Sequence, residues 1–258
     1  MANSNQYTAR NIETMEMLYG TGYLSMGGDD EVARIVSRVE VSGKQLLDIG
    51  CGLGGALITL AANHGAAQAH GIDIDAGVLA RANALVAAAD LQDRVSLAQF
   101  APGPLPFADA SFDLVYLTAV SCHIEDLGPF FSEIRRVIRA GGYLLGGEWY
   151  RRADNDAYRQ WDELLRARGL NFYFVTSEEF EAALGAAGFE EISIVDRGAA
   201  MATLSQGYLD RVENELKPRL LDAMGADDYA SFLEWTRARA NGLAAGGAGY
   251  GHFLARNN

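Results

Sequence analysis

A glycine-dense run directly after a short apolar stretch constrains the fold of this chain more than any other feature. The stretch 46–49 (Leu-Leu-Asp-Ile) has the composition of a strand and carries Asp48 near its end. Three glycines follow where a helix should open, at Gly50, Gly52 and Gly54. Glycine lets the backbone turn sharply and approach a ligand closely, because it has no side chain. The run therefore predicts a strand, a tight turn and a helix, with a ligand at the turn.

A second acidic strand end supports this interpretation. The stretch 69–73 has strand composition and ends in Asp73. The number of residues between the glycines and Asp73 is typical of a Rossmann-type βαβ unit. In such a unit, a carboxylate at this position binds the two hydroxyls of a ribose. A glycine fingerprint alone also fits dinucleotide-binding domains, so a nicotinamide-dependent oxidoreductase stays an alternative.

The next stretches predict a parallel sheet. Residues 104–116 read as a loop, a turn and a fourth strand. Residues 135–145 read as a helix that ends in a Gly141-Gly142 turn before a fifth strand. Strands alternate with helices up to Trp149, which favours an α/β fold with right-handed crossovers.

The remaining elements are expected at the two ends of the chain. Short helices are expected over 11–19 and near 30–38, with a glycine-rich loop over 20–28 between them. Thr176 opens a capping box, so a helix should begin there and stop at Gly188. Further strands are expected over 190–196 and 250–255. The segments 151–174 and 205–240 read as helical, and 242–251 reads as a flexible, hinge-like loop.

Composition narrows the class of protein. The chain has 258 residues, enough for one large α/β domain, and no apolar stretch long enough to span a bilayer. Cys51 and Cys122 are expected to be free thiols, which favours a reducing, cytoplasmic compartment. The net charge of −13 argues against nucleic acid, and the basic cluster 135–139 is expected to complement a helix end. We expect a small-molecule substrate, no membrane association and no metal site.

The order of these motifs resembles the class I S-adenosylmethionine-dependent methyltransferases. The resemblance implies a Rossmann-like, mostly parallel seven-stranded sheet and S-adenosylmethionine as cofactor. We expect a single domain over 1–258, with a cofactor-binding core at 40–149. An N-terminal lid segment is expected at 1–28 and a helical substrate lid at 150–175 and 205–240. The residues expected to bind the cofactor are Tyr23, Leu24, Ser25, Asp48, Gly50, Gly52, Gly54, Asp73, Ile74, Phe100, Ala101 and Thr118.

A closer resemblance runs along nearly the whole chain. The segments 5–8, 19–28, 161–163, 175–180 and 250–253 are similar to the phosphoethanolamine N-methyltransferases. In that family the opening segment closes over the active site, and its tyrosine pairs with a histidine after the fourth strand. The resemblance implies that Tyr7 and His123 form this catalytic pair here.

The chain departs from that family where the acceptor binds. The family has an aspartate four residues before the histidine, and this chain has Ala119. A tyrosine after the fifth strand is Trp149 here, and the family's phosphate-binding cations are missing near Leu170 and Phe172. Burying a phosphate without cations is costly. We therefore expect Ala119, Trp149, Leu170 and Phe172 to line a pocket for an acceptor with an aromatic or hydrophobic body.

These observations favour methyl transfer to a nitrogen, carbon or oxygen atom of a small molecule. The protein should align the two reactants and exclude water, and His123 should take a proton directly or through Tyr7. Glu148 is expected to pair locally and not to act as the base. Two further alternatives stay open: a phosphoethanolamine N-methyltransferase proper, and a non-catalytic protein that binds S-adenosylmethionine. The sequence leaves the acceptor, the number of transfers and the oligomeric state open.

Overall fold

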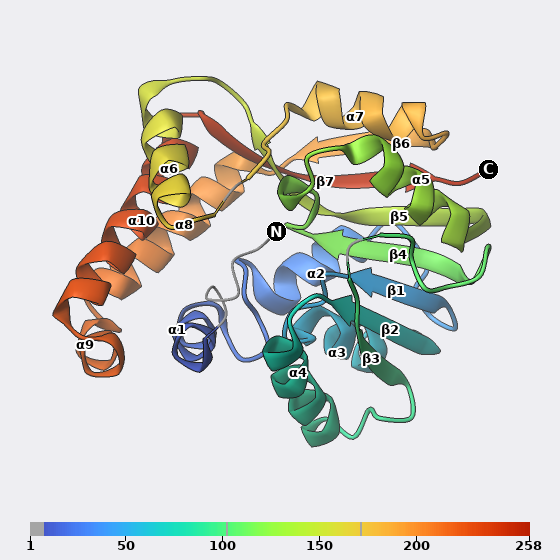
Figure 1. Cartoon of the computed structure of the whole chain (residues 1–258), viewed down its shortest axis with the longest axis horizontal. Coiled ribbons are helices and arrows are strands. Elements are labelled where there is room, and N and C mark those ends of the chain that lie inside the picture. Colours follow the sequence, from blue (N-terminus) through green and yellow to red (C-terminus); the bar gives the residue numbers. More distant parts are fainter. Residues whose placement is uncertain (1–7, 102, 171) are drawn as a thin grey trace.

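The computed structural model describes residues 8–101, 103–170 and 172–258, and seven strands in this part of the chain form one sheet (Figure 1). Their order is β3-β2-β1-β4-β5-β7-β6, and β7 alone runs antiparallel to its neighbours. This confirms the predicted α/β fold with a mostly parallel, seven-stranded sheet. The strands are β1 (Gln45–Ile49), β2 (Gln68–Asp73), β3 (Val95–Gln99), β4 (Phe112–Thr118), β5 (Ile138–Arg151), β6 (Glu190–Asp196) and β7 (Ala248–Arg256).

Helices cover both faces of the sheet and also form a separate layer beside it. The helices are α1 (Ala9–Tyr19), α2 (Gly28–Val36), α3 (Gly55–Ala62), α4 (Ala76–Ala88), η1 (Ser121–His123), α5 (Leu127–Val137), α6 (Asp156–Ala167), α7 (Ser177–Ala186), α8 (Gly198–Glu213), α9 (Lys217–Met224) and α10 (Ala226–Ala244). Leu47 and Ile49 of β1 pack with α5 and α7, whereas Leu46 packs with α2 and α3. Successive side chains of a strand point to opposite faces, so an apolar strand is buried on both.

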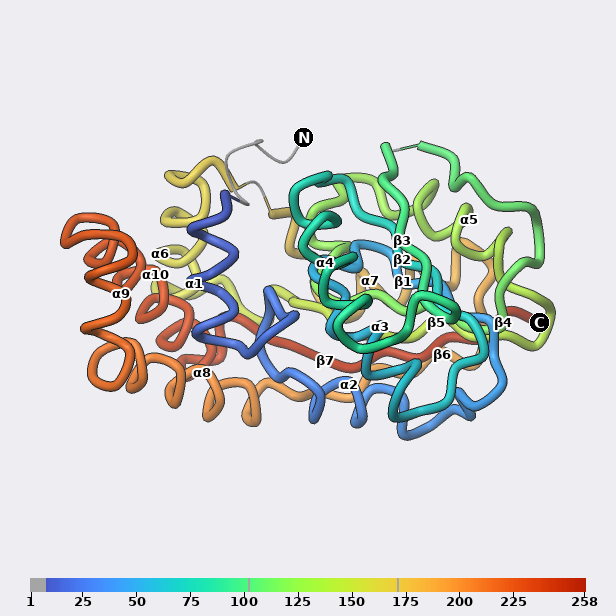
Figure 2. Tube along the Cα trace, turned by 90° about the horizontal axis from the view of Figure 1, so that it is seen from below, coloured from blue at the N-terminus to red at the C-terminus, as the bar shows by residue number. Residues whose placement is uncertain are grey.

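The separate layer consists of α1, α6, α8, α9 and α10, which we call the lid. Figure 2 shows these five helices gathered on one side of the sheet. They adjoin the edge where β4 and β5 end and β7 begins. The lid has its own core, rich in aromatic side chains, which includes Trp161, Phe174, Tyr229 and Phe232. The lid therefore faces the end of the sheet where parallel α/β folds bind ligands.

Local signals located several elements correctly. Thr176 forms the predicted capping box: its hydroxyl accepts from the N–H of Glu179, and the Glu179 carboxylate accepts from the N–H of Thr176 at 2.7 Å. Strand β6 has the predicted bounds. Both cysteines are free and buried. No helix in the described ranges is long and apolar enough to cross a membrane.

The predicted hinge-like loop at 242–251 is wrong. Helix α10 continues to Ala244 and β7 begins at Ala248, so a short turn replaces the loop. Gly242 packs between Ala157, Trp161 and Ala248, and this packing outweighs the low helix propensity of glycine. The turn closes with the N–H groups of Gly246 and Gly247 bound to α10 carbonyls, as at many helix ends.

Three other expectations need correction. In the described part of the segment 151–174, α6 is the only helix, and the second expected helical segment begins at Gly198, the start of α8, and not at residue 205. Residue 151 still belongs to β5, and the chain after α6 passes through Gly169, whose left-handed φ of +74° ends the helix. The expected Gly141-Gly142 turn is an irregularity inside β5, which follows α5 directly.

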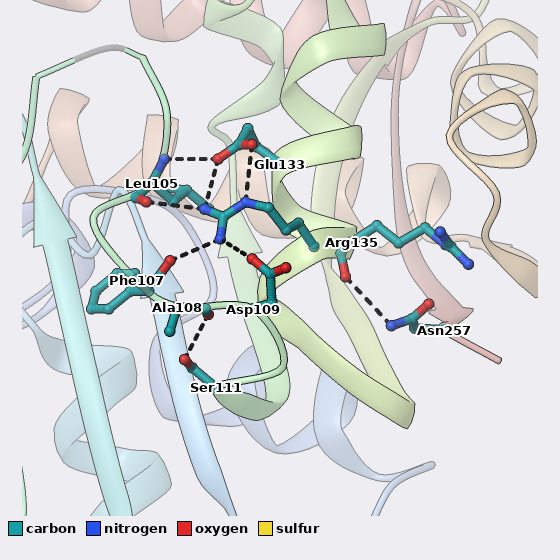
Figure 3. A network of polar contacts seen from close by, with 9 residues as sticks. Leu105, Phe107, Ala108, Asp109, Ser111, Glu133, Arg135 and Asn257 are labelled. Atoms are coloured by element: carbon teal, nitrogen blue, oxygen red, sulfur yellow. Dashed lines mark hydrogen bonds and ion pairs between the residues drawn. The ribbon is translucent and has the colours of Figure 1, made fainter.

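The basic cluster at 135–139 binds neighbouring segments and does not simply complement the end of α5. Arg136 makes an ion pair with Asp109 at 2.7 Å and another with Glu133 at 2.9 Å. It also donates to the carbonyls of Leu105 and Phe107, and Figure 3 shows these partners around one guanidinium. These contacts hold the loop that precedes β4.

Candidate cofactor and acceptor site

The glycine loop lies at the carboxyl end of β1, where the strand order changes direction between β2 and β4. The φ angles of Gly50, Gly52 and Gly54 are +68°, +54° and +80°. This left-handed region is costly for residues with a side chain, so the loop requires glycine at these positions. The N–H groups of Gly50 and Cys51 donate to the carbonyl of Ile72, and α3 starts directly after the loop. The loop thus places glycine backbone, exposed at Gly50, between the end of β1 and the start of a helix, as in nucleotide-binding folds.

Two carboxylates lie beside this loop. Asp73 accepts from the N–H of Gly52 at 2.9 Å and from the N–H of Asp75 at 3.0 Å. Burial raises the pKa of Asp73, and burial together with Asp73 holds the pKa of Asp48 well above its usual range. A carboxylate has about four lone-pair sites, so Asp73 can still accept from two ribose hydroxyls.

The carboxyl end of β3 lies next to Asp73. The N–H of Phe100 donates to the Asp73 carbonyl at 2.9 Å, and Gln99 donates to the carbonyl of Ile74 at 3.0 Å. Ile74 is 43% exposed, which is high for a large apolar side chain, and Phe100 is half-buried. Ala101 is exposed at the same edge. These groups can supply an apolar surface and backbone contacts for a flat base.

The loop between α1 and α2 covers the glycine loop. The carbonyl of Gly22 accepts from the N–H of Gly55 at 3.0 Å, and the Leu24 side chain lies against Gly52. Tyr23 shares hydrogen bonds with Asp29 at 2.5 Å and Thr59 at 3.1 Å. Burial raises the pKa of Tyr23, so its hydroxyl stays protonated. Ser25 is half-buried in the same loop.

A buried carboxylate organises the loop after β4. Glu148 is 1% exposed and accepts from the N–H of Val120 at 3.1 Å, the N–H of Ser121 at 2.8 Å and the Ser121 hydroxyl at 2.5 Å. Its other oxygen accepts from the N–H of Trp149 at 2.8 Å. These bonds agree with the expected local pairing of Glu148. They position the loop that begins at Ala119, which itself has a left-handed φ of +55°.

His123 follows on this loop and retains contact with solvent. Its ring lies 4.5 Å from the ring of Phe172, and its side chain makes no hydrogen bond to any described residue. Desolvation by the surrounding protein lowers the pKa of His123 to about 4. The imidazole is therefore neutral near pH 7 and can accept a proton. Tyr7 lies outside the described residues, so its pairing with His123 stays a prediction.

Four aromatic side chains extend from His123 into the lid, and we call them the aromatic wall: Phe172, Phe174, Trp161 and Trp149. Neighbouring rings in this order lie 5.1, 5.2 and 5.5 Å apart, and the first two pairs are stacked. Phe172 and Trp149 are half-buried, and Leu170 packs against the same core. Three of the predicted acceptor residues thus lie on one side of the site, and Ala119 lies at the end of β4.

Sequence reasoning missed two buried ionic groups. Glu31 of α2 binds His252 of β7 at 2.5 Å and Arg197 at 3.2 Å, which fastens α2 to the sheet and to α8. Arg239 lies in the middle of α10 and is 3% exposed. No spacing or motif marked either group, because their partners are far away in the sequence. Within the described residues, no three His, Cys, Asp or Glu side chains are arranged to hold a metal ion.

Comparison with known proteins agrees with this geometry. Residues 47–146 match the family of methyltransferase domains. Phosphoethanolamine N-methyltransferase 1 of Arabidopsis thaliana is 26% identical over 254 residues, which cover 98% of this chain and 50% of that protein. The chain spans about half the length of the first curated relatives that it matches.

Solved structures show the same arrangement. Phosphoethanolamine N-methyltransferase 2 of Haemonchus contortus, in complex with S-adenosylmethionine, superimposes with a TM-score of 0.87 and 25% identity, over 98% of this chain and 58% of that one. The cyclase SpnF gives a TM-score of 0.72 at 21% identity, over 97% of both chains. This second likeness shows the fold alone.

Proposed function

We propose that this chain, which belongs to the class I S-adenosylmethionine-dependent methyltransferases, transfers a methyl group from that cofactor to a small-molecule acceptor. The observation that carries the proposal is the glycine loop, with three left-handed glycines and the Asp73 carboxylate beside it. It lies within the matched methyltransferase domain, at the switch point of the sheet.

The residues around the glycine loop fit the cofactor. Asp73 would hold the ribose hydroxyls, the backbone of the glycine loop would face the cofactor, and Phe100 and Ile74 would flank the adenine. Tyr23, Leu24 and Ser25 would cover it from the N-terminal side. The bound cofactor supplies a methyl group on a positively charged sulfur, and a positive charge near Asp48 would favour the ionised form of this buried carboxyl, whose pKa burial and Asp73 otherwise hold high. The chain's own contribution is to align the acceptor and to exclude water.

We propose an acceptor with an aromatic or hydrophobic body. The aromatic wall supports this choice, because it offers stacked apolar faces next to His123. His123 would take the proton that the acceptor gives up, and its neutral imidazole near pH 7 supports this role. A phosphoethanolamine N-methyltransferase proper is the second candidate, favoured by the similarity to the Arabidopsis and Haemonchus proteins. Ala119 argues against it, because it offers no carboxylate to the substrate amine.

A screen with labelled S-adenosylmethionine tests the proposal. Candidate acceptors are ethanolamine phosphates, aromatic amines, indoles and phenols, and we expect transfer to a member of the last three classes. Absence of transfer to all four classes, with the cofactor bound, would favour the non-catalytic alternative. Nucleotide-dependent redox activity would favour the oxidoreductase alternative.

The proposed pair of Tyr7 and His123 is tested with the acceptor so found. His123→Ala should lower kcat roughly a hundredfold to ten-thousandfold and leave cofactor affinity unchanged. Tyr7→Phe should also lower kcat, and the double variant should lose less than the product of the two effects if they act as a unit. His64→Ala, on the loop after α3, is the matched control. Near-full turnover in His123→Ala would assign that residue a structural role.

We also propose a cytoplasmic location, a single domain over 1–258, and no nucleic acid partner. Two free, buried thiols support a reducing compartment. The net charge of −13 supports a small-molecule acceptor over nucleic acid. Cell fractionation with an antibody to the chain tests the location, and a filter-binding assay tests the nucleic acid.

A further inference from the structure

Arg239 is a buried cation with an incomplete set of partners. Its Nε donates to the Ser205 hydroxyl at 3.2 Å, and one terminal nitrogen donates to the Tyr19 hydroxyl. The guanidinium lies 4.7 Å from the ring centre of Trp235 and 5.7 Å from that of Tyr19. The other terminal nitrogen, Nη2, is buried and has no hydrogen-bond partner among the described residues.

The charge of Arg239 has no carboxylate to balance it. No ion pair joins Arg239 to any described Asp or Glu, in contrast to buried Glu31, which pairs with Arg197 and also bonds to His252. The residues outside the described part are 1–7, Pro102 and Asn171, and none of them is acidic. Arginine stays protonated in proteins, and a buried charge is costly unless it is paired. An anion from outside this sequence would balance this charge.

The position of Arg239 connects it to the acceptor side of the site. It lies one helical turn before Gly242, whose backbone packs against Trp161 of the aromatic wall. The indole N–H groups of Trp161 and Trp235 are also buried without a partner in the described ranges. Tyr19 and Trp161 share one apolar core with Cys122, the residue before His123. The unpaired donors thus belong to, or contact, the core that includes Cys122.

We propose that Arg239 binds an acidic group of the methyl acceptor, a carboxylate or a phosphate, while the aromatic wall contacts the acceptor's apolar body. This inference rests on the proposed function and adds a charge requirement to it. Arginine suits the role because its planar donors match the oxygens of both groups. The aromatic rings around the guanidinium exclude water and so strengthen the contact.

Binding of simple aromatic acids tests the proposal without knowledge of the true acceptor. The probes are phenylacetate and phenyl phosphate, with phenylacetamide as the neutral counterpart, titrated by calorimetry in saturating S-adenosylhomocysteine. The variants are Arg239→Met and Arg239→Lys. Arg237→Met is the matched control, because Arg237 is exposed on the same helix and pairs with Glu213.

We expect at least one acidic probe to bind the unsubstituted protein at least tenfold more tightly than the amide. Arg239→Met should lose this preference, Arg239→Lys should keep part of it, and Arg237→Met should keep it fully. If phenylacetate binds more tightly than phenyl phosphate, the acidic group of the acceptor is a carboxylate. The reverse order indicates a phosphate. Equal binding of acid and amide to the unsubstituted protein would overturn the proposal, as would an undiminished preference in Arg239→Met.

Two further measurements distinguish acceptor binding by Arg239 from a structural or a cofactor-binding role. Without any probe, Arg239→Met should unfold at the same temperature as the unsubstituted protein or at a higher one, because replacing an unpaired buried charge removes a cost. A lower unfolding temperature, or failure to fold, would make Arg239 structural and overturn the proposal.

S-adenosylhomocysteine should bind all variants equally; a selective loss in Arg239→Met would assign the arginine to the cofactor. If the unsubstituted protein binds no S-adenosylhomocysteine, the proposed function itself fails.

Discussion

Replacement of Glu148 should separate the positioning of the loop after β4 from the chemistry of His123. Glu148→Ala leaves four buried donors without an acceptor: the N–H groups of Val120, Ser121 and Trp149, and the Ser121 hydroxyl. An unsatisfied buried donor costs roughly 1–3 kcal/mol. Some of these donors will find water in the space left by the side chain, so we expect a total loss of about 3–5 kcal/mol in the free energy of unfolding.

Glu148→Gln is the conservative counterpart. Its amide oxygen can replace the oxygen that accepts three bonds, but its NH₂ group then faces the N–H of Trp149. One hydrogen bond is lost, and we expect a cost of about 1–3 kcal/mol near pH 5. Burial raises the pKa of Glu148, so the folded state holds its proton to higher pH than the unfolded state. The free energy of unfolding of the wild type should therefore fall as the pH rises from the Glu148 pKa of the unfolded state to that of the folded state. The difference in this free energy between the wild type and Glu148→Gln should narrow over the same range.

Urea unfolding followed by circular dichroism measures these differences at pH 5 and pH 8. Glu181→Gln, at an exposed position on α7, is the control and should change stability little. The kcat of folded Glu148→Gln should fall while its affinity for S-adenosylhomocysteine stays constant, because the loop that carries His123 shifts. A Glu148→Ala variant as stable as the wild type would refute this account of the loop.

Three further predictions concern the cofactor, the acceptor and pH. Asp73→Ala should weaken S-adenosylmethionine binding by about 1.5–3 kcal/mol in calorimetry, and unchanged affinity in a folded variant would remove Asp73 from the site. Phosphoethanolamine should turn over poorly because Ala119 offers its amine no carboxylate; efficient, saturable turnover at low concentration would contradict this. The lowered pKa of His123 means that folded protein resists its protonation, so stability should fall as pH drops from about 6.5 toward about 4. His123→Ala should show less of this loss in unfolding experiments across that range.

The sequence predicted those parts of the fold that depend on local chemistry. The capping box at Thr176 and the bounds of β6 follow from residues close together in the chain. The error at 242–251 arose because its glycines were read as a sign of flexibility. Gly247 instead lies where a Cβ would clash with Asn155 and Tyr158, and only the folded chain shows those neighbours.

The candidate site likewise has one part that the sequence predicted and one part that it did not. The glycine loop and Asp73 were predictable, because backbone conformation and ribose binding require particular residues at particular spacings. Apart from the N–H of Trp149, the hydrogen-bond partners of Glu148 and Arg239 come from segments 27 to 220 residues away, and no periodicity connects them. Only tertiary packing brings these groups together. The sequence therefore gave no sign of Arg239, and for Glu148 it predicted only that the side chain pairs locally.

This division bears on how the chain can resemble one family over nearly its whole length and still take another acceptor. The cofactor half depends on backbone angles that glycine adopts, so few substitutions are tolerated there. The acceptor half is built from side chains that β4, β5, the segment after α6 and α10 contribute separately. Exchange of Ala119, Trp149 or Phe172 changes the surface offered to the acceptor without altering the sheet beneath it. Similarity of fold therefore supports the proposed cofactor, while the proposed acceptor rests on the aromatic wall and Arg239.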